Sequence, residues 1–334
     1  MSIVHTLSIG ARLRMTMAVV LITIVALSAQ GQTNPSVRKP ARKKSKLVLV
    51  KPASAAADSI ARADSLRALE RARAAADSLR RQQQAEEKRR IDSISALALR
   101  VVPQTAFGIG ERLVFDVNYG FITAGEATMT IGGYDSIAGR KCYRVEFAVN
   151  SLPSFSWIYR VEDRYYTFID VEAIVPWRFE QHIREGNYRR DFVADFDQFR
   201  HLAKTTGGEY EIPPYVHDIM SAFYFARTMD YSESKPGDMY TLFNFYKDKS
   251  HELGVKFLGR QELDVGAGTF NTIVVEPLVK EGGLFKSEGR IVIWLSDDEL
   301  KIPVRVNTKV VIGSIDTELR EYSGLRGTLK ARTK

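Results

Sequence analysis

The chain has 334 residues, with 48 Lys or Arg, 40 Asp or Glu and a single cysteine. One cysteine excludes an intramolecular disulfide, and the length is sufficient for one substantial hydrophobic core. The net charge of +8 is uneven, because residues 1–100 carry 19 basic and 7 acidic side chains and residues 101–334 carry 29 and 33. The basic charge lies outside the segment with the composition of a folded domain, which argues against a nucleic-acid-binding face.

An apolar segment over residues 15–29 follows two arginines and ends in small residues. This pattern is typical of a secretory signal peptide. The segment is shorter than the roughly 20 residues of a membrane-spanning helix, so we expect cleavage near Ser28, Ala29 or Gly31. The sequence therefore predicts a signal peptide over residues 1–31, and a retained anchor is the alternative. The predicted location is the periplasm or cell envelope. The cleavage region holds no cysteine, so a lipid anchor is not expected.

Residues 32–57 form a basic stretch that contains Pro40 and has no apolar period. Like charges repel one another and proline disfavours a helix, so this segment is predicted to be a flexible, extended linker. Near an anionic membrane each cation contributes on the order of 1 kcal/mol to attachment. The alternative is therefore a contact with anionic lipid headgroups or cell-wall polymers through Arg38, Lys39, Arg42, Lys43, Lys44 and Lys46.

Residues 58–100 are rich in Ala, Arg and Glu and contain neither Gly nor Pro. Opposite charges four residues apart, which support a helix, occur at Asp58/Arg62, Asp77/Arg81 and Glu86/Arg90. The large apolar residues form a broken seam and no sustained heptad. We predict a helical or coiled-coil spacer that would extend for about 60 Å, and a disordered arm is the alternative.

Apolar and polar residues alternate through most of residues 101–334, a period typical of strands with one buried face. The alternation is clearest at Leu113/Phe115/Val117, Ala127/Met129/Ile131, Tyr143/Val145/Phe147, Phe192/Ala194/Phe196 and Val304/Val306/Thr308. Turn signals separate the runs at Gly132-Gly133, Gly186-Asn187, Gly207-Gly208, Gly266-Ala267-Gly268 and Gly282-Gly283. Short turns between successive strands imply antiparallel hairpins.

The segment after Pro213-Pro214 breaks this alternation. Its apolar residues are too dense for a half-buried strand and Asp218 is suitably placed as an N-cap, so we predict a helix at about 216–230 that packs against the sheet. The predicted fold is mainly β, a single curved antiparallel sheet or open half-barrel with one packed helix, preceded by a long helical or disordered arm. A filled core and a lined cavity are both compatible with this arrangement.

Several motifs of the folded domain resemble one known family. They are Gly110-Glu111-Arg112-Leu113, Ala124-Gly125-Glu126-Ala127, the run from His217 to Ala222 that ends at Arg227, and Ile293-Trp294-Leu295-Ser296-Asp297-Asp298 followed by Ile302-Pro303-Val304. In order and spacing, over about residues 107–325, they are similar to the exported bacterial family catalogued as domain of unknown function 3108. The resemblance implies an envelope-located, mostly β domain and no established activity. More loosely, such domains are similar to half-barrel carriers of lipoproteins and lipids, by fold analogy.

Few residues carry chemistry. Cys142 lies on an alternating strand, where an inert structural role is expected. His217-Asp218 could supply a base with its orienting carboxylate, and Asp297-Asp298 an acid/base pair, although an N-cap and turn chemistry explain these carboxylates without catalysis. The histidines and acidic residues lack metal-ligand spacing, and no nucleotide, phosphate or nucleophile motif occurs. We therefore expect neither a metal nor a cofactor.

Three functions remain. The first is a non-catalytic binding or carrier module for a hydrophobic or amphiphilic ligand, such as a lipid or an acylated protein. Its candidate ligand-binding residues, which plain core packing would also explain, are Phe115, Tyr119, Phe147, Phe223 and Trp294. The second is a structural envelope protein that docks a protein partner at a distance set by the helical arm. The third is a hydrolase that uses Asp297/Asp298 or His217/Asp218.

Overall fold

The computed structural model of the protein describes residues 55–95, 99–279, 290–309 and 313–334. These residues form two separate units, the helix α2 (Ala55–Ser95) and the domain from Leu99 to Lys334. The signal peptide predicted over residues 1–31 and residues 32–54 of the predicted linker lie outside the described part of the chain.

Helix α2 has 41 residues and begins three residues before the predicted spacer. Between Arg67 and Arg89 every side chain is exposed except that of Glu87, which is half-buried. Without a buried face over this stretch, the helix depends on the intrinsic propensities of Ala, Arg and Glu and on ion pairs one turn apart. The coiled-coil alternative stays a prediction. No helix among the described residues is long and apolar enough to cross a membrane.

The domain is built on one antiparallel sheet of fourteen strands, which confirms the predicted fold class. The strands are β1 Arg112–Tyr119, β2 Ile122–Ile137, β3 Arg140–Ser151, β4 Glu162–Asp170, β5 Pro176–Glu185, β6 Tyr188–Asp197, β7 Leu202–Thr205, β8 Gly208–Glu211, β9 Met239–Tyr246, β10 Lys249–Val265, β11 Gly268–Val279, β12 Ile291–Ser296, β13 Pro303–Lys309 and β14 Ser314–Ser323. Two short helices interrupt them, α3 Pro153–Ser156 and α4 Ile219–Ala226.

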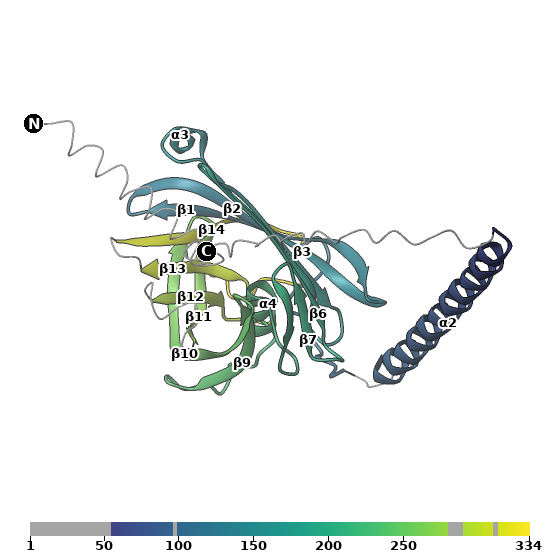
Figure 1. Cartoon of the computed structure of the whole chain (residues 1–334). Coiled ribbons are helices and arrows are strands. Elements are labelled where there is room, and N and C mark those ends of the chain that lie inside the picture. Colours follow the sequence, from purple (N-terminus) through teal and green to yellow (C-terminus); the bar gives the residue numbers. More distant parts are fainter. Residues whose placement is uncertain (1–54, 96–98, 280–289, 310–312) are drawn as a thin grey trace, which may run out of the picture. The chain divides into compact units, whose positions relative to one another are not determined.

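Each strand pairs with its neighbours in sequence, except that β1 pairs with β14 and that β8 and β9 form the two edges of the sheet. The sheet is therefore open between β8 and β9, the two strands that α4 connects along the chain. Figure 1 shows the strands curving around α4. The predicted half-barrel with one packed helix is thus present.

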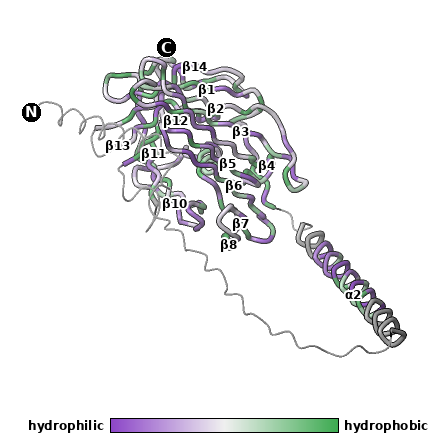
Figure 2. The backbone as a smooth tube through the Cα atoms, turned by 45° about the horizontal axis from the view of Figure 1, so that its top comes forward, coloured by the Kyte–Doolittle hydropathy of each residue, from purple (hydrophilic) through white to green (hydrophobic). Residues whose placement is uncertain are grey.

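The alternation along each strand decides which side chains enter the core. On β3, Tyr143, Val145 and Phe147 are buried, whereas Arg144 between them is exposed. The inward sets of the strands, together with one face of α4, form the principal hydrophobic cluster. Figure 2 shows hydrophobic and hydrophilic residues alternating along the strands.

One predicted turn is wrong. Gly132 and Gly133 lie inside β2, where the register with β3 shifts between Ile131 and Gly133. The glycines accommodate a bulge, and the two strands continue to pair beyond it as far as Ile137 and Arg140. A bulge absorbs one extra residue without ending the ladder, so glycine marks a bend here and no chain reversal. The predicted turn at Gly282-Gly283 lies outside the described residues, and the other three glycine signals form the β5–β6, β7–β8 and β10–β11 hairpins.

Helix α4 is shorter than the helix predicted at about 216–230. Its expected first turn is extended, because His217 exchanges backbone hydrogen bonds with β9. The amide of His217 donates to the carbonyl of Phe243 (2.8 Å), and the amide of Phe245 donates to the carbonyl of His217 (2.7 Å). Beyond Arg227 the backbone hydrogen bonds, from the amides of Thr228 and Met229, span three residues, and this tighter turn ends the α-helix.

A buried ion pair fixes the C-terminal end of α4. Arg227 and Glu111 form two parallel N–H···O bonds of 2.7 and 2.8 Å, and their side chains are 0% and 1% exposed. The guanidinium also donates to the carbonyl oxygens of Ala106 (2.9 Å) and Leu300 (3.1 and 3.2 Å). Burial alone lowers the pKa of Arg227, but the Glu111 carboxylate more than offsets this, and the pKa is raised. Arg227 therefore stays charged and joins α4 to the start of β1 and to the β12–β13 loop.

Loss of one partner of this pair should destabilise the domain strongly. Arg227→Met leaves Glu111 buried without a counter-charge, which costs about 3–5 kcal/mol, measurable as a lower free energy of unfolding in urea. The double variant Glu111→Leu/Arg227→Met should lose less than the sum of the two single losses. The control is Arg112→Met, which removes an exposed pair with Glu321 (4.0 Å) and should cost under about 1 kcal/mol. Similar losses for the two arginine variants would contradict the assigned role.

Candidate functional site

Helix α4 lies on the inner face of the sheet, and its N-terminal end is fixed by a buried carboxylate. The Asp218 side chain accepts hydrogen bonds from the amides of Met220 (2.7 Å) and Ser221 (2.9 Å), and from the hydroxyl of Thr167 on β4 (2.7 Å). The first two bonds satisfy the free amides of the first helical turn. Burial raises the pKa of Asp218 to about 6.

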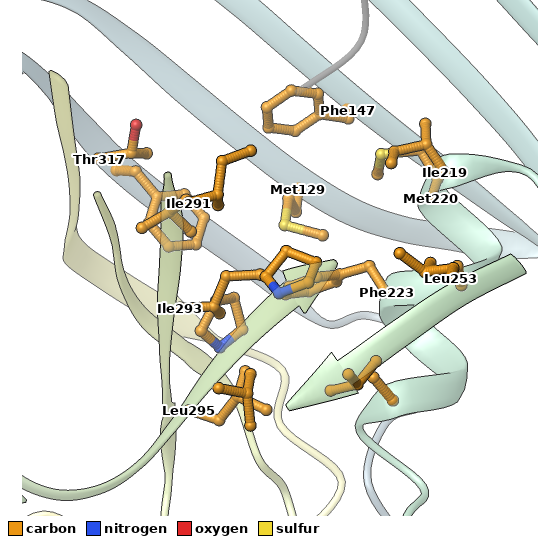
Figure 3. A pocket seen from close by; sticks show the side chains of 18 residues that line it. Met129, Phe147, Ile219, Met220, Phe223, Leu253, Ile291, Ile293, Leu295 and Thr317 are labelled. Atoms are coloured by element: carbon orange, nitrogen blue, oxygen red, sulfur yellow. The ribbon is translucent and has the colours of Figure 1, made fainter. Parts of the chain in front are cut away.

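Between α4 and the strands lies a cavity of about 120 Å³. Its lining comes from α4 and from eight neighbouring strands of the sheet, in the order β3, β2, β1, β14, β13, β12, β11 and β10. The lining residues are Phe115, Met129, Phe147, Ile219, Met220, Ala222, Phe223, Ala226, Leu253, Val255, Val275, Pro277, Ile291, Ile293, Leu295, Pro303, Val306 and Thr317. Figure 3 shows side chains of α4 and of the strands converging on this space.

The cavity has the chemistry of a hydrocarbon site. Of its eighteen lining residues only Thr317 has a polar side chain. A site without charged groups or convergent hydrogen-bond donors cannot compensate the desolvation of a polar ligand. Its volume is close to that of an apolar cavity of about 150 Å³ that binds benzene. The arrangement can therefore hold a short apolar segment.

The structure brings three of the five predicted aromatic residues together. Phe115 on β1, Phe147 on β3 and Phe223 on α4 all line the cavity. Tyr119 lies outside the lining, at the end of β1, and packs against the principal core. Trp294 also lies outside the lining: its neighbour Ile293 faces the cavity, and the guanidinium of Arg305 lies 5.5 Å from the centre of the Trp294 ring. Adjacent strand residues point to opposite faces of the sheet, so Ile293 and Trp294 cannot both line the cavity.

The family described as "Protein of unknown function (DUF3108)" matches residues 114–320, well over half of the chain. The chain belongs to the DUF3108 family. The matched segment runs from β1 to β14 and includes α4 and every strand that lines the cavity. No curated protein matches the sequence.

Solved structures similar to the DUF3108 domain include a β-barrel-like protein of domain of unknown function DUF1849 from Brucella abortus, with a TM-score of 0.44 and 11% identity over 68% of this chain and 99% of that chain. A candidate lipoprotein from Parabacteroides distasonis has a TM-score of 0.30 and 10% identity, over 68% of this chain and 100% of that chain. A candidate exported protein with a YmcC-like fold from Bacteroides fragilis has a TM-score of 0.31 and 10% identity, again over 68% and 100%.

In the DUF3108 domain, His217 and Asp218 do not form a base with its orienting carboxylate. Asp218 is engaged by the helix cap and by Thr167. The His217 ring lies 4.9 Å from that of Phe225, and its Nδ1 has no hydrogen-bond partner among the described residues. Burial, and then the positive charge of Arg100, lower the pKa of His217 to about 3. The imidazole is therefore neutral and a weak base at physiological pH.

Asp297 and Asp298 are likewise engaged in structure. Asp298 accepts hydrogen bonds from the Ser296 hydroxyl (2.8 Å) and from three backbone amides, those of residues 300, 301 and 331 (3.0 to 3.2 Å). Asp297 pairs with Arg260 on β10, with 2.9 Å between Nε and Oδ2. Asp298 thus holds the β12–β13 turn, as turn chemistry predicted, and the two carboxylates have different partners.

The structure also contains a buried pair of carboxyl side chains that the sequence does not predict. Asp163 on β4 and Glu185 on β5 are 0% and 1% exposed. Asp163 accepts from the amide of Arg184 (2.8 Å), and Glu185 accepts from the hydroxyl of Tyr159 (3.4 Å). Burial, together with the neighbouring Asp163, raises the pKa of Glu185 to about 9, and burial also raises the pKa of Asp163. The two residues are 22 positions apart and meet only because β4 and β5 pair, so no local motif reveals them.

The single cysteine is an unreactive structural residue. Cys142 is buried, and burial raises the pKa of its thiol to about 12, so the reactive thiolate is scarce at neutral pH. Within the described part of the chain, no three His, Cys, Asp or Glu side chains are grouped closely enough to hold a metal ion.

Because of the carboxyl pair, we expect the free energy of unfolding to fall as pH rises. The raised pKa means that folded Glu185 keeps a proton which the unfolded chain releases. The stability from this proton is therefore complete below about pH 4.5 and is lost as pH rises towards 9, with a slope of up to about 1.4 kcal/mol per pH unit. We expect urea unfolding to show this slope in the wild type and a flatter profile in Glu185→Gln. Glu180→Gln, on the same strand, is the control, and an unchanged slope in Glu185→Gln would refute the assignment.

Proposed function

We infer that the protein is a non-catalytic binding or carrier module, and that its cavity takes the hydrocarbon part of a lipid, an acylated protein or a similar amphiphile. The observation that carries this inference is the cavity between α4 and the sheet, in which seventeen of eighteen lining residues are apolar or aromatic without a polar group. The engagement of Asp218, Asp297 and Asp298 in structural hydrogen bonds makes a hydrolase the weaker alternative.

The size of the cavity indicates how the ligand binds. Burial of each methylene contributes about 0.8 kcal/mol, so a short alkyl segment is sufficient for micromolar to millimolar binding once association costs are subtracted. A polar headgroup would stay outside, because the lining offers it only the Thr317 hydroxyl. The ligand class is therefore defined by an apolar tail, and the headgroup contributes little to recognition in the cavity.

Filling the cavity tests this function. Ala222 is buried on α4 and lines the cavity, so Ala222→Phe places a ring in the space that an alkyl segment would occupy. We expect isothermal titration with sodium laurate to give one site on the wild-type chain and at least about tenfold weaker binding to the variant. Native mass spectrometry of the gently purified chain should also detect a co-purified amphiphile.

The matched control for this test is Ala148→Phe. Ala148 follows the cavity residue Phe147 on β3 and is half-buried outside the lining. Laurate binding should be unchanged in this variant, and thermal unfolding should show that both variants are folded. A wild-type chain that carries no amphiphile and binds no laurate would refute the carrier function.

The proposed location is the periplasm or cell envelope, reached through a cleaved signal peptide and without a lipid anchor. The support is the apolar segment at residues 15–29 and the small residues that follow it. We expect N-terminal sequencing of periplasmic chain from a Gram-negative host to show cleavage after Ser28, Ala29 or Gly31. Leu21→Arg, which places a charge in the apolar core, should leave the chain uncleaved in the cytoplasm. An uncleaved wild-type chain would contradict this proposal.

Helix α2 supports a second function, that of a spacer. Its 41 residues correspond to about 60 Å at 1.5 Å per residue, and its described side chains between Arg67 and Arg89 are exposed or, at Glu87, half-buried. Such a helix sets a distance without burying a face. In this role α2 would set the distance at which the domain docks a protein partner, and it is compatible with the carrier function.

A further inference from the structure

The two most exposed large hydrophobic side chains of the described residues are Phe121, 97% exposed, and Trp157, 81% exposed. Phe121 lies at the tip of the β1–β2 hairpin beside Ile122, which is 46% exposed, and Trp157 directly follows α3. Large apolar side chains that stay exposed contribute little to the stability of the fold, and exposed apolar patches mark interaction sites. We call Phe121, Ile122 and Trp157 the aromatic rim.

The strand register places these loops side by side at one end of the sheet. The β1–β2 hairpin leads to Gly125, which pairs with Ser151 at the end of β3. The amide of Leu152, just before α3, donates to the carbonyl of Ala124 (3.0 Å). The β5–β6 hairpin adjoins the α3 loop in turn, because the amide of Gly186 donates to the carbonyl of Arg160 (2.8 Å). The two loops that carry the aromatic rim are therefore neighbours, and the β5–β6 hairpin lies beside the α3 loop.

Hydrogen bonds within the loops hold the rim in place. In the α3 loop the indole Nε1 of Trp157 donates to the carbonyl of Ser154 (2.9 Å), and the Ser156 hydroxyl donates to the carbonyl of Leu152 (2.8 Å). In the hairpin the Thr123 hydroxyl donates to the Asn118 side chain (2.8 Å). These hydrogen bonds order the backbone of the two loops while the side chains of the rim stay exposed. A loop that is already ordered loses less conformational entropy on docking.

The loops next to the aromatic rim carry positive charge. The loop residues 119–125, 151–161, 186–190 and 313–315 contain no Asp or Glu and three arginines, Arg160, Arg189 and Arg190. Arg160 pairs with Glu162 just beyond its loop (2.6 Å), whereas the guanidinium of Arg189 is exposed and donates only to backbone carbonyls of its own hairpin. The opposite end of the sheet carries both signs of charge, with Glu172 and Glu299 but also Arg200 and Lys301. The loops next to the aromatic rim therefore favour an anionic partner.

We propose that the aromatic rim docks the domain onto an anionic phospholipid membrane, with Phe121 and Trp157 inserted at headgroup level and Arg189 close to the lipid phosphates. Trp is favoured at membrane interfaces because its ring is apolar and its N–H is polar. Apolar insertion and cation attraction reinforce each other in surface-bound proteins. This contact does not depend on the cavity, so it holds or fails independently of the carrier function.

Flotation of the full chain with vesicles of phosphatidylethanolamine and phosphatidylglycerol tests this proposal. The basic linker also attracts anionic lipid, so binding is measured at low salt and at about 0.5 M NaCl, where surface charge is screened and apolar insertion persists. At high salt the double variant Phe121→Ser/Trp157→Ser should bind at least about tenfold more weakly than wild type. The control is Tyr134→Ser, which replaces an aromatic residue 53% exposed at the other end of β2 and should bind like wild type.

Tryptophan fluorescence gives a second measurement that is specific to the rim. Addition of vesicles should shift the emission of wild type to shorter wavelength, and brominated lipid should quench it. Both effects should largely disappear in Trp157→Phe, because the two remaining tryptophans are buried (Trp177) or half-buried (Trp294) in the domain. Vesicle binding itself should persist in this variant. Equal binding of the double variant and wild type at high salt, or an unchanged wild-type spectrum, would overturn the proposal; either result would favour a protein partner for the rim.

Discussion

The position of α4 depends on one buried interaction, the bidentate pair between Arg227 and Glu111. A charge that is 0% exposed is tolerated only where it is paired and hydrogen-bonded. All three guanidinium nitrogens of Arg227 donate, to the Glu111 carboxylate and to the carbonyls of Ala106 and Leu300. Because a buried ion pair contributes little net stability relative to apolar packing, its principal effect is geometric. It ties the helix to β1 and to the β12–β13 loop, while Asp218 ties the other end to β4.

With both ends fixed, α4 serves as part of the wall of a cavity. The sheet is open between β8 and β9, and the side chains of α4 and of the facing strands leave a space of about 120 Å³. The charged groups of this region, Asp218 and Arg227, lie at the helix ends, where they form hydrogen bonds, and the cavity wall between them is apolar except for Thr317. This separation explains why the carboxylates near α4 serve the fold and why the cavity suits a hydrocarbon segment.

Much of the fold was predictable, because alternation and turn residues are local signals. The open antiparallel sheet, the helix and its Asp218 cap followed from them. The errors also have local causes. Gly132-Gly133 has the composition of a turn but forms a bulge, because β3 continues to pair beyond it. Trp294 shares a motif with Ile293, yet the pleat turns their side chains to opposite faces.

The sequence by itself determined the strand pattern and the placement of basic charge before residue 101, since each depends on residues close together along the chain. Only the tertiary structure decided that a cavity exists, that Arg227 meets Glu111, that Asp163 meets Glu185, and that Phe121 and Trp157 share one end of the sheet. These features depend on the register and closure of strands many residues apart. Pairing of that kind is set by the packing of the whole core, and no local pattern encodes it.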